Sequence, residues 1–569
     1  MASKYDMGKL VMDNPSLHKR RSYVPNLSYH SQFDMNAGLL YPMSAPIEVL
    51  PSDTFKVKHA LKIRMTNPPK VPVMDQLVFD MYWFYVPNRI VWSNYDDFFT
   101  GNVGTRWNTI SDKTIPVVEL NATTCTGSLF DLMGCFVDLG PYPGGSYFVN
   151  ALPFRGYKSI WNYYFRFESL QDEIYFPLDD SNESADDEHI ATYVGAYYTN
   201  LSDYLTYVTT GKFVLAPVNK LPGYYERALP MPQASPDVEI LGLNNAIFGG
   251  NYQPDSSLTD PHGLQFNFDK DVAEYGIMTY EPSSLSKSTL LFAQGETNSY
   301  LQSISGSLTG ITGNTIRDLR YAFMLQHLYE LDATWGRRVN EYTEGHFGTN
   351  VPDYRLDQPE FLSHKRVYIG INQVIQSSSS TEASPQGNVG AWSDTIDTGF
   401  DFVKSFCENG FLIPVCCIRI LNHTYSQGLQ KLWTRSDRLD FYDPVFAGLG
   451  DMPIYTHELF AHSTTPQNAI FGYQESWAEY KWLPNHVAGH CRPNVANSLA
   501  VWNYSEYFTS RPYLDATWVL EGCSTIDRTM YLESSTTVSQ FIVDCYFDIG
   551  AYRCMPLHNI MNASLTNSW

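Results

Sequence analysis

The stretch Asp75–Val91, DQLVFDMYWFYVPNRIV, decides the fold. Its odd positions are apolar or aromatic from Leu77 to Tyr85, whereas its even positions mix polar and apolar side chains such as Asp80 and Phe84. Alternation with a period of two is the pattern of a β-strand that has one fully apolar face. Pro87 then lacks a backbone donor and ends the strand. We predict that this strand is central in a β-sandwich.

The C-terminal stretch Gln540–Tyr552 repeats the alternation. Its odd positions form a second apolar face, and Asp544 and Asp548 lie opposite it. Because the two strands come from opposite ends of the chain, we predict that they are partners in a sheet closed by long-range pairing. The residues between them are then further strands, loops and insertions.

A third strand is predicted at Thr54–Met65, and its polar face is basic. Apolar side chains and His59 occupy one face, while the other carries Lys56, Lys58, Lys62 and Arg64. Two interpretations stay open for this basic stripe. It is either an ordinary exposed face neutralised by the surplus carboxylates, which we favour, or a surface that meets an anionic partner.

Two segments have helical periodicity. Ala151–Gln171 is predicted to be partly helical, and Thr315–Trp335 is the clearest helix, with Asn314 as its N-cap and Gly336 as its stop. Apolar residues wrap most of the circumference of the second helix. A helix of that kind is buried by other protein rather than by one sheet face.

The composition points to a protein with many contacts rather than to an enzyme. The 569 residues are 15% aromatic, include 40 Tyr, and are only 17% charged. Aromatic residues are enriched at protein interfaces, although abundant Tyr also suits carbohydrate-binding β-proteins. No flexible linker is evident, so we predict one elaborated domain, residues 36–569, preceded by an N-terminal arm, residues 1–35.

The formal net charge of −22 limits any contact with nucleic acid to local sites. The N-terminal arm is one candidate, either as a solvated tail or as an interior nucleic-acid anchor in which Tyr23 and Tyr29 would stack on bases. Its cations are Lys4, Lys9, Lys19, Arg20 and Arg21.

Cysteine usage and hydropathy bear on the compartment. The nine cysteines have no framework spacing, and several lie in apolar runs, which indicates free thiols in a reducing compartment. The N-terminus has no apolar signal region, and no run approaches 18 apolar residues. We therefore expect neither secretion through a signal peptide nor a membrane span.

The motifs that could carry catalysis are weak. His457 and His462 in HELFAH are five residues apart, one too many for two zinc ligands on one helical face. His486 and His490 have the right spacing, but Pro484 and Gly489 disfavour a regular helix there. Nucleophile-elbow, phosphate-loop and CxxC motifs are missing from the sequence. We predict a non-enzymatic protein without a cofactor.

Several long blocks, in the same order along the chain, resemble the major capsid protein of the Microviridae, most closely the gokushovirus type. They include EVLPSDTF at 48–55, ALPFRGYKSIWNYYFRFESLQ at 151–171, HFGTNVPDYRLDQPEFL at 346–362, TYSQGLQKLWTRSDRLDFYDPVFAGLG at 424–450, FGYQESWAEYKWLPNHVAGHCRP at 471–493 and QFIVDCYFDIGAYRCMP at 540–556. The resemblance implies a mainly β fold, a single eight-stranded jelly roll with large loop and helical insertions. It also implies a T=1-like icosahedral shell around circular single-stranded DNA, assembled in the cytoplasm of a bacterial host.

The resemblance further implies an internal scaffolding protein, a DNA pilot protein and a host surface receptor as partners. One insertion would form a protrusion at the threefold axes for host attachment; residues 172–226 are favoured over residues 237–312. Within the 424–450 block, Arg435, Asp437, Arg438 and Asp440 are expected to pair across a subunit contact or within the chain. The rival hypothesis is a monomeric, Tyr-rich, carbohydrate-binding β-sandwich that acts as an adhesin or glycan-processing accessory.

Overall fold

The computed structural model describes a mainly β chain with helical insertions. The described residues are 22–24, 27–100, 113–121, 125–135, 146–185, 213–235, 264–266, 276–279, 292–294, 316–336, 338–378, 386–387, 389–421, 424–462, 466, 468–531 and 538–554. The chain forms two compact units, residues 1–234 with 330–569 and residues 235–329.

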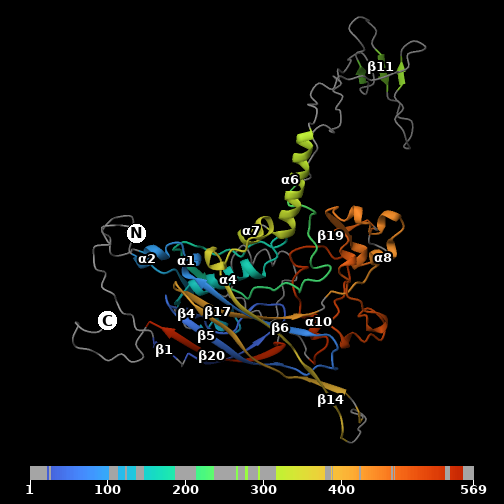
Figure 1. Ribbon diagram of the computed structural model, residues 1–569. Helices are drawn as coiled ribbons and strands as arrows, with labels where there is room; N and C mark the ends of the chain where they lie inside the picture. The colour runs from blue at the N-terminus through green and yellow to red at the C-terminus, as the bar shows by residue number, and fades with distance from the viewer. Residues whose placement is uncertain are drawn as a thin grey trace, which may run out of the picture. The chain divides into compact units, whose positions relative to one another are not determined.

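Two antiparallel sheets form the centre of the first unit (Figure 1). One has the strand order β1–β20–β5–β16, with β2 also pairing with β20, and the other has the order β13–β6–β17–β3, with β4 also pairing with β17. The strands of the first sheet are β1 (Ser22–Val24), β2 (Tyr29–Met35), β5 (Thr54–Met65), β16 (Thr395–Ser405) and β20 (Phe541–Arg553). Those of the second are β3 (Tyr41–Pro42), β4 (Ile47–Val49), β6 (Leu77–Pro87), β13 (Glu360–Tyr368) and β17 (Gly410–Ile420).

The predicted central strand is β6, and it lies between β13 and β17. Its odd side chains face the other sheet: the ring of Trp83 lies 5.6 Å from that of Phe402 and 5.2 Å from that of Phe547. The prediction that β6 and the C-terminal strand pair directly is wrong. β20 pairs with β5 and β2, so the two strands meet across the core through their side chains.

Two pieces of the expected N-terminal arm are strands of the first sheet, because β1 and β2 both pair with β20. The ring of Tyr29 packs on Phe547, and its hydroxyl lies 2.5 Å from that of Ser44. Burial raises the pKa of Tyr29. This ring is therefore part of the core and is not available to stack on a base.

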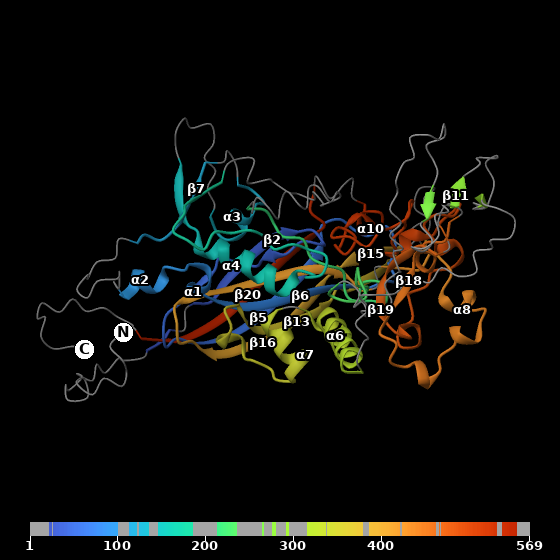
Figure 2. The ribbon, with the colours of Figure 1, turned by 90° about the horizontal axis from the view of Figure 1, so that it is seen from above.

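The outer face of the second sheet is covered by the chain itself. Helix α4 (Leu152–Ile160) continues into a π-helical turn, Trp161–Phe165, as the sequence predicts for this segment. The ring centroids of Phe165 and Tyr82 lie 5.2 Å apart. Gly156 lets the helix approach the sheet closely, because a Cβ at this position would lie only 3.1 Å from Ile413 Cδ1. Figures 1 and 2 show α4 lying across this sheet.

Smaller elements complete the first unit. The segments β7, β8 and β9 form a three-stranded sheet, and β14–β15 and β18–β19 form two-stranded ones. Their bounds are β7 (Val117–Leu120), β8 (Tyr147–Asn150), β9 (Glu183–Ala185), β14 (Ile371–Ile375), β15 (Val389–Ser393), β18 (Asp451–Tyr455) and β19 (Ile470–Glu475). The short helices include α1 (Asn88–Val91), α2 (Tyr95–Thr100), α3 (Leu129–Leu132), α7 (Val339–Phe347), α8 (Lys431–Thr434), α9 (Thr456–Leu459) and α10 (Ser524–Asp527).

The two candidate protrusions differ in what the structure describes. Of residues 172–226, the described parts reach the main core, where Phe213 and Val218 are buried; residues 186–212 lie outside the described part. Of residues 237–312, the described part is the antiparallel sheet β10 (Leu264–Phe266), β11 (Gly276–Thr279) and β12 (Phe292–Gln294) in the second unit.

The clearest predicted helix is α6 (Ile316–Trp335), and the boundary between the units falls inside it. Gly336 ends it with a φ of +96°, as predicted, while Asn314 lies outside the described residues. Among the described residues, α6 and every other helix are too short or too polar to cross a bilayer. All nine cysteines are free, and five of them are buried.

Asp80 ties together the three strands β13, β6 and β17. Arg366 from β13 donates to both carboxylate oxygens at 2.6 and 2.9 Å, Arg419 from β17 donates to Oδ2, and His364 Nε2 lies 3.1 Å from Oδ1. Burial by itself raises the pKa of Asp80, but the hydrogen bonds from His364 and Arg366 and the charge of Arg419 hold it well below its usual range.

Asp80→Asn should therefore destabilise the fold strongly, because two arginines keep their charge and lose their buried partner. We expect the free energy of unfolding to fall by about 3–5 kcal/mol in urea denaturation. The matched control is Asp548→Asn, which removes an exposed pair with Lys58 and should cost under about 1 kcal/mol. Equal losses in both variants would contradict the role given to Asp80.

Candidate functional site

The segment Leu429–Gly450 is an apolar surface that the chain does not bury. None of its residues is buried. The most exposed apolar residues in it are Val445, at 84%, and Trp433, at 73%. With the neighbouring 480–483 stretch it forms what we call the α8 patch. Its exposed large apolar residues are Leu429, Leu432, Trp433, Leu439, Phe441, Tyr442, Val445, Phe446, Leu449, Tyr480, Trp482 and Leu483.

The backbone of the α8 patch is nevertheless held in place. Trp477 Nε1 donates to the Phe446 carbonyl at 2.9 Å, and Ser476 Oγ donates to the Ala447 carbonyl at 3.2 Å. Tyr442 stacks edge-on against Trp477, with ring centroids 5.6 Å apart. The patch is thus a shaped surface rather than a loose loop. Figure 1 shows α8 at one end of the first unit.

The four predicted interface charges all lie in the α8 patch, and three of them have partners inside the chain. Arg435 pairs with Glu479 at 3.3 Å and stacks on Tyr480. Asp440 accepts the backbone N–H groups of Ser436 and Asp437, and Asp437 accepts that of Arg438. The Arg438 side chain is exposed and has no ion-pair partner among the described residues.

The predicted basic stripe lies on β5, and most of it is paired. Lys58 Nζ lies 3.4 Å from Asp548, while Lys62 and Arg64 lie 3.6 and 2.8 Å from Asp394. Lys56 is exposed and has no ion-pair partner among the described residues. The predicted cations of the N-terminal arm, Lys4, Lys9, Lys19, Arg20 and Arg21, lie outside the described residues.

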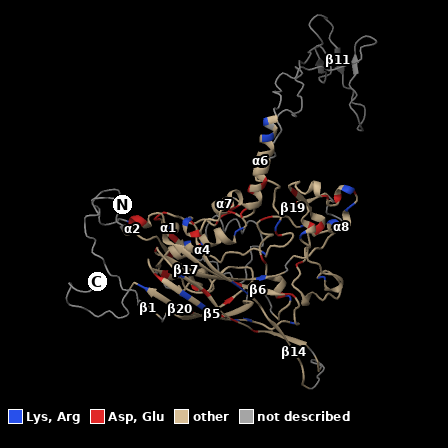
Figure 3. Ribbon diagram, in the orientation of Figure 1, with Lys and Arg blue, Asp and Glu red and all other residues tan. Residues whose placement is uncertain are grey.

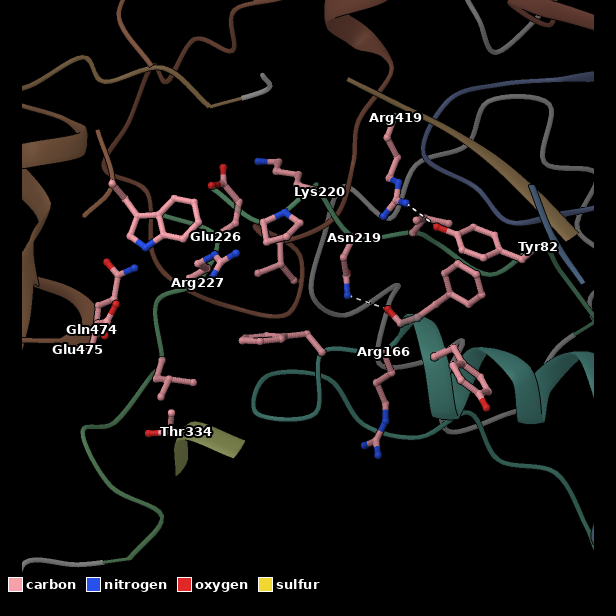
Figure 4. A pocket seen from close by; sticks show the side chains of 18 of the residues that line it. Tyr82, Arg166, Asn219, Lys220, Glu226, Arg227, Thr334, Arg419, Gln474 and Glu475 are labelled. Carbon is pink, nitrogen blue, oxygen red and sulfur yellow. Dashed lines mark hydrogen bonds between the residues drawn. The ribbon is translucent and has the colours of Figure 1, made fainter. Parts of the chain in front are cut away.

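A cleft of about 670 Å³ lies between the second sheet and its insertions (Figure 4). Tyr82 and Arg419 come from the sheet, and Trp482 and Arg227 close the opposite side, where the guanidinium lies 4.2 Å from the indole ring. The cations that line the cleft are largely satisfied within the chain. Lys220 pairs with Glu506 at 2.9 Å, Arg166 with Glu173 at 2.9 Å, and Arg419 with Asp80.

Carboxylates gather at one end of this cleft. Asp451 lies there beside Glu475, with Glu330 of α6 close to Gly450. Burial raises the pKa of Asp451 to about 6, and the negative charges of Glu330 and Glu475 add to the shift. Within the described part of the chain, no three His, Cys, Asp or Glu residues are grouped so that they could hold a metal ion.

Sequence reasoning missed this cleft, because its lining comes from nine separate stretches of the chain, between Tyr82 and Val519. It did single out HELFAH. In the structure Glu458 accepts hydrogen bonds from the Tyr224 hydroxyl at 3.1 Å and from the Tyr455 N–H at 2.9 Å. That glutamate is buried, and its carboxylate and carbonyl accept hydrogen bonds from the hydroxyls of Tyr224 and Tyr225.

The raised pKa of Asp451 predicts a pH dependence of stability. The folded chain holds the Asp451 proton more tightly than the unfolded chain, so stability falls as the pH rises from 3.8 to about 6. Asp451→Asn cannot ionise and should escape this loss. In urea titrations at a series of pH values, the free energy of unfolding of the variant should rise relative to that of the parent chain between pH 4 and 7. A difference that is constant with pH would contradict the assignment, and Glu330→Gln should move the window to lower pH.

Comparison with known proteins agrees with these features. A family model described as "Capsid protein (F protein)" matches residues 14–562. The capsid protein VP1 of Chlamydia phage 1 is 31% identical over 598 residues, which cover 95% of each chain. That of Bdellovibrio phage phiMH2K is 32% identical with 96% of each chain covered, and that of Spiroplasma virus 4 is 32% identical with 86% covered.

These matches run along nearly the whole chain, and the resemblance to Microviridae capsid proteins is confirmed. The chain belongs to the capsid protein (F protein) family of single-stranded DNA phages.

Proposed function

We propose that this protein is the structural subunit of a T=1-like icosahedral shell that encloses circular single-stranded DNA. Its two central sheets would form an eight-stranded jelly roll in which β1 with β2, and β3 with β4, each count as one interrupted strand, because each pair lies along a single partner, β20 or β17. The α8 patch is the observation that supports assembly most strongly. The patch has twelve exposed large apolar residues, nine of them between Leu429 and Gly450, where no residue is buried. Apolar patches of this size mark surfaces that contact another protein.

The energy available from covering the α8 patch is large. Burying one large apolar side chain fully contributes about 1.5–3 kcal/mol, so even half-burial of the patch amounts to roughly 10 kcal/mol before the costs of association. A contact of this kind repeats around each symmetry axis of a closed shell. Weak individual contacts then add to a stable particle.

Helix α6 is a second surface of the same kind. Ile316, Tyr321 and Met324 are each about seven-tenths exposed, and their spacing of five and eight residues places them on one broad face of the helix. The sequence predicts that other protein buries this helix. We infer that neighbouring subunits cover it in the shell.

Arg438 is the best candidate for an ionic contact between subunits. It is exposed in the α8 patch, whereas Arg435, Asp437 and Asp440 already have intrachain hydrogen bonds. A carboxylate of a neighbouring copy is the partner that its planar guanidinium would bind best.

The proposal extends to partners and location. The shell would form in the cytoplasm of a bacterial host with an internal scaffolding protein and a DNA pilot protein. DNA contacts would be local and independent of base sequence, through the N-terminal arm. A surface insertion, residues 172–226 or residues 237–312, would bind the host receptor. A non-enzymatic role is consistent with the family.

Charging the α8 patch should prevent assembly without unfolding the chain. In Trp433→Ser with Val445→Asp, the patch loses its two most exposed apolar groups in the 429–449 segment. It also gains a carboxylate, and burying that charge in a subunit contact would cost a large desolvation free energy. Electron microscopy and sedimentation should show unassembled chains, while thermal unfolding stays within a few degrees of the parent.

Met74→Asp is the matched control, because Met74 is 82% exposed but lies outside the α8 patch. It should leave shells intact. Normal shells from the double variant would remove the patch as the assembly surface. A parent chain that stays monomeric in every condition and binds glycans would favour the rival adhesin function.

The N-terminal cations give a separate prediction for DNA. Neutralising Lys19, Arg20 and Arg21 to Gln should lower the amount of DNA in purified particles, because up to three phosphate contacts are lost. Particle yield should not change. The DNA-to-protein ratio from ultraviolet absorbance measures this, and an unchanged ratio would exclude the arm as the DNA anchor.

A further inference from the structure

The outer face of the sheet β20–β5–β16 carries exposed aromatic rings among lysines. Side chains at even positions of β5 and β20 point away from the core, as the alternating burial of both strands shows. We call this surface the β20–β5 face. Its members are Tyr23, Lys56, Lys58, Lys62, Arg64, Ile396, Phe400, Val403, Ile542, Tyr546 and Tyr552.

The two sheets differ sharply in how their outer faces are covered. On the second sheet, Tyr82 and Phe84 contact Phe165 and Tyr164 of the helical segment that follows them in the chain. On the β20–β5 face, Phe400 is 58% and Tyr552 is 52% exposed. Helices α1, α4 and α7 lie on the other side of the molecule from this face (Figure 1).

The strand register leaves the ring of Tyr546 open. Its cross-strand neighbour on β5 is Ala60, and the next residue across is Thr398 on β16, so small side chains flank it on that side. On the other side its neighbour is His30 of β2. Lys58 and Lys62 lie on the two diagonals, within reach of anything placed on the ring. The exposed ring therefore lies among two cations of β5 and two carboxylates of its own strand, Asp544 and Asp548.

A second aromatic pair lies at the far end of the same strand. Tyr23 and Tyr552 pair across β1 and β20, with ring centroids 5.0 Å apart. Gly550 is required beside them, because a Cβ there would lie 2.5 Å from the Tyr23 hydroxyl. Lys56 faces Gly550 across the strands and has no ion-pair partner among the described residues.

The charge of the β20–β5 face contrasts with that of the chain. Its four cations, Lys56, Lys58, Lys62 and Arg64, are matched by four carboxylates, Asp34, Asp394, Asp544 and Asp548, so the face has no net formal charge. The whole chain carries −22. Figure 3 shows Lys and Arg next to Asp and Glu along β5 and β20.

We propose that the β20–β5 face is a stacking platform for single-stranded DNA, a site that deepens the proposed shell function and rests on it. Exposed aromatic rings on a sheet, flanked by lysines, bind unpaired bases by stacking and their phosphates by charge. Tyr546 and Tyr552 are six residues apart, about 20 Å along the strand, which accommodates several nucleotides. The pairing of Lys58 and Lys62 with carboxylates keeps the phosphate attraction weak and the binding independent of sequence.

The test uses the full-length chain and a fluorescein-labelled 20-mer of thymidylate, with binding followed by anisotropy. Tyr546→Ser with Tyr552→Ser should raise the Kd about tenfold, because two stacking contacts are lost. Tyr546→Phe with Tyr552→Phe keeps both rings and should bind like the parent. The matched control for loss of exposed tyrosine is Tyr513→Ser with Tyr531→Ser, which lie outside the platform at 62% and 65% exposure.

Two further measurements separate stacking from charge. Duplex DNA offers no unpaired bases, so its affinity should be the same in the Ser double variant and in the parent. Lys56→Gln should reduce the slope of log Kd against log salt by about 0.7, the value for one lost phosphate contact on a single strand.

Electron microscopy of every variant distinguishes failure of this site from failure of the shell function. A parent that forms shells but does not bind the 20-mer, or a Ser double variant with unchanged Kd, would overturn the platform and leave the shell intact. Loss of shells with unchanged Kd would make the face a contact between copies, which also overturns it. A parent that forms no shells would overturn the proposed function.

Discussion

The structure depends on the burial of β6 on both of its faces. Its inner face meets the opposite sheet through Trp83, Phe402 and Phe547, and its outer face is covered by the helical segment that carries Tyr164 and Phe165. This arrangement uses the large helical insertion on one sheet only. The other sheet keeps an uncovered outer face, and the α8 patch stays exposed at the edge of the unit. The β20–β5 face and the α8 patch are exposed because the insertions of the chain do not pack on them. Both surfaces are available to other molecules.

Much of the fold could be predicted from period-two patterns, because burial on one face of a strand leaves a direct trace in the sequence. Thr54–Met65, the central strand, the C-terminal strand, the partial helix after Ala151 and the helix that ends at Gly336 all appear where predicted. The prediction that β6 pairs with β20 is wrong for a physical reason. Two strands with matching apolar faces can be neighbours in one sheet, or they can lie in two sheets that pack face to face. The apolar pattern is the same in both cases, and only the hydrogen-bonding partners of each strand distinguish them.

The candidate site was harder to predict. Charged residues of the 424–450 block attract attention in the sequence, yet Arg435, Asp437 and Asp440 serve local caps and pairs, while the exposed apolar residues between them form the larger surface. Periodicity does not reveal such a segment, because its short helical turns have no repeat. Tyr546 and Tyr552 did carry a signal: aromatic residues at even positions of β20 alternate with Asp544 and Asp548, on a face that was expected to be polar. The sequence does not indicate which residues pair with Asp80, because Arg366 and Arg419 come from strands almost 290 and 340 residues away.

In the proposed shell, copies of this chain would cover the apolar surface that a single chain leaves exposed. Electron cryomicroscopy of particles made by the parent chain, co-expressed with its neighbouring viral genes, tests this most directly. We expect closed isometric particles in which Leu429–Gly450 is buried against an adjacent subunit. Closed particles with this segment facing solvent, or a chain that remains monomeric, would contradict it.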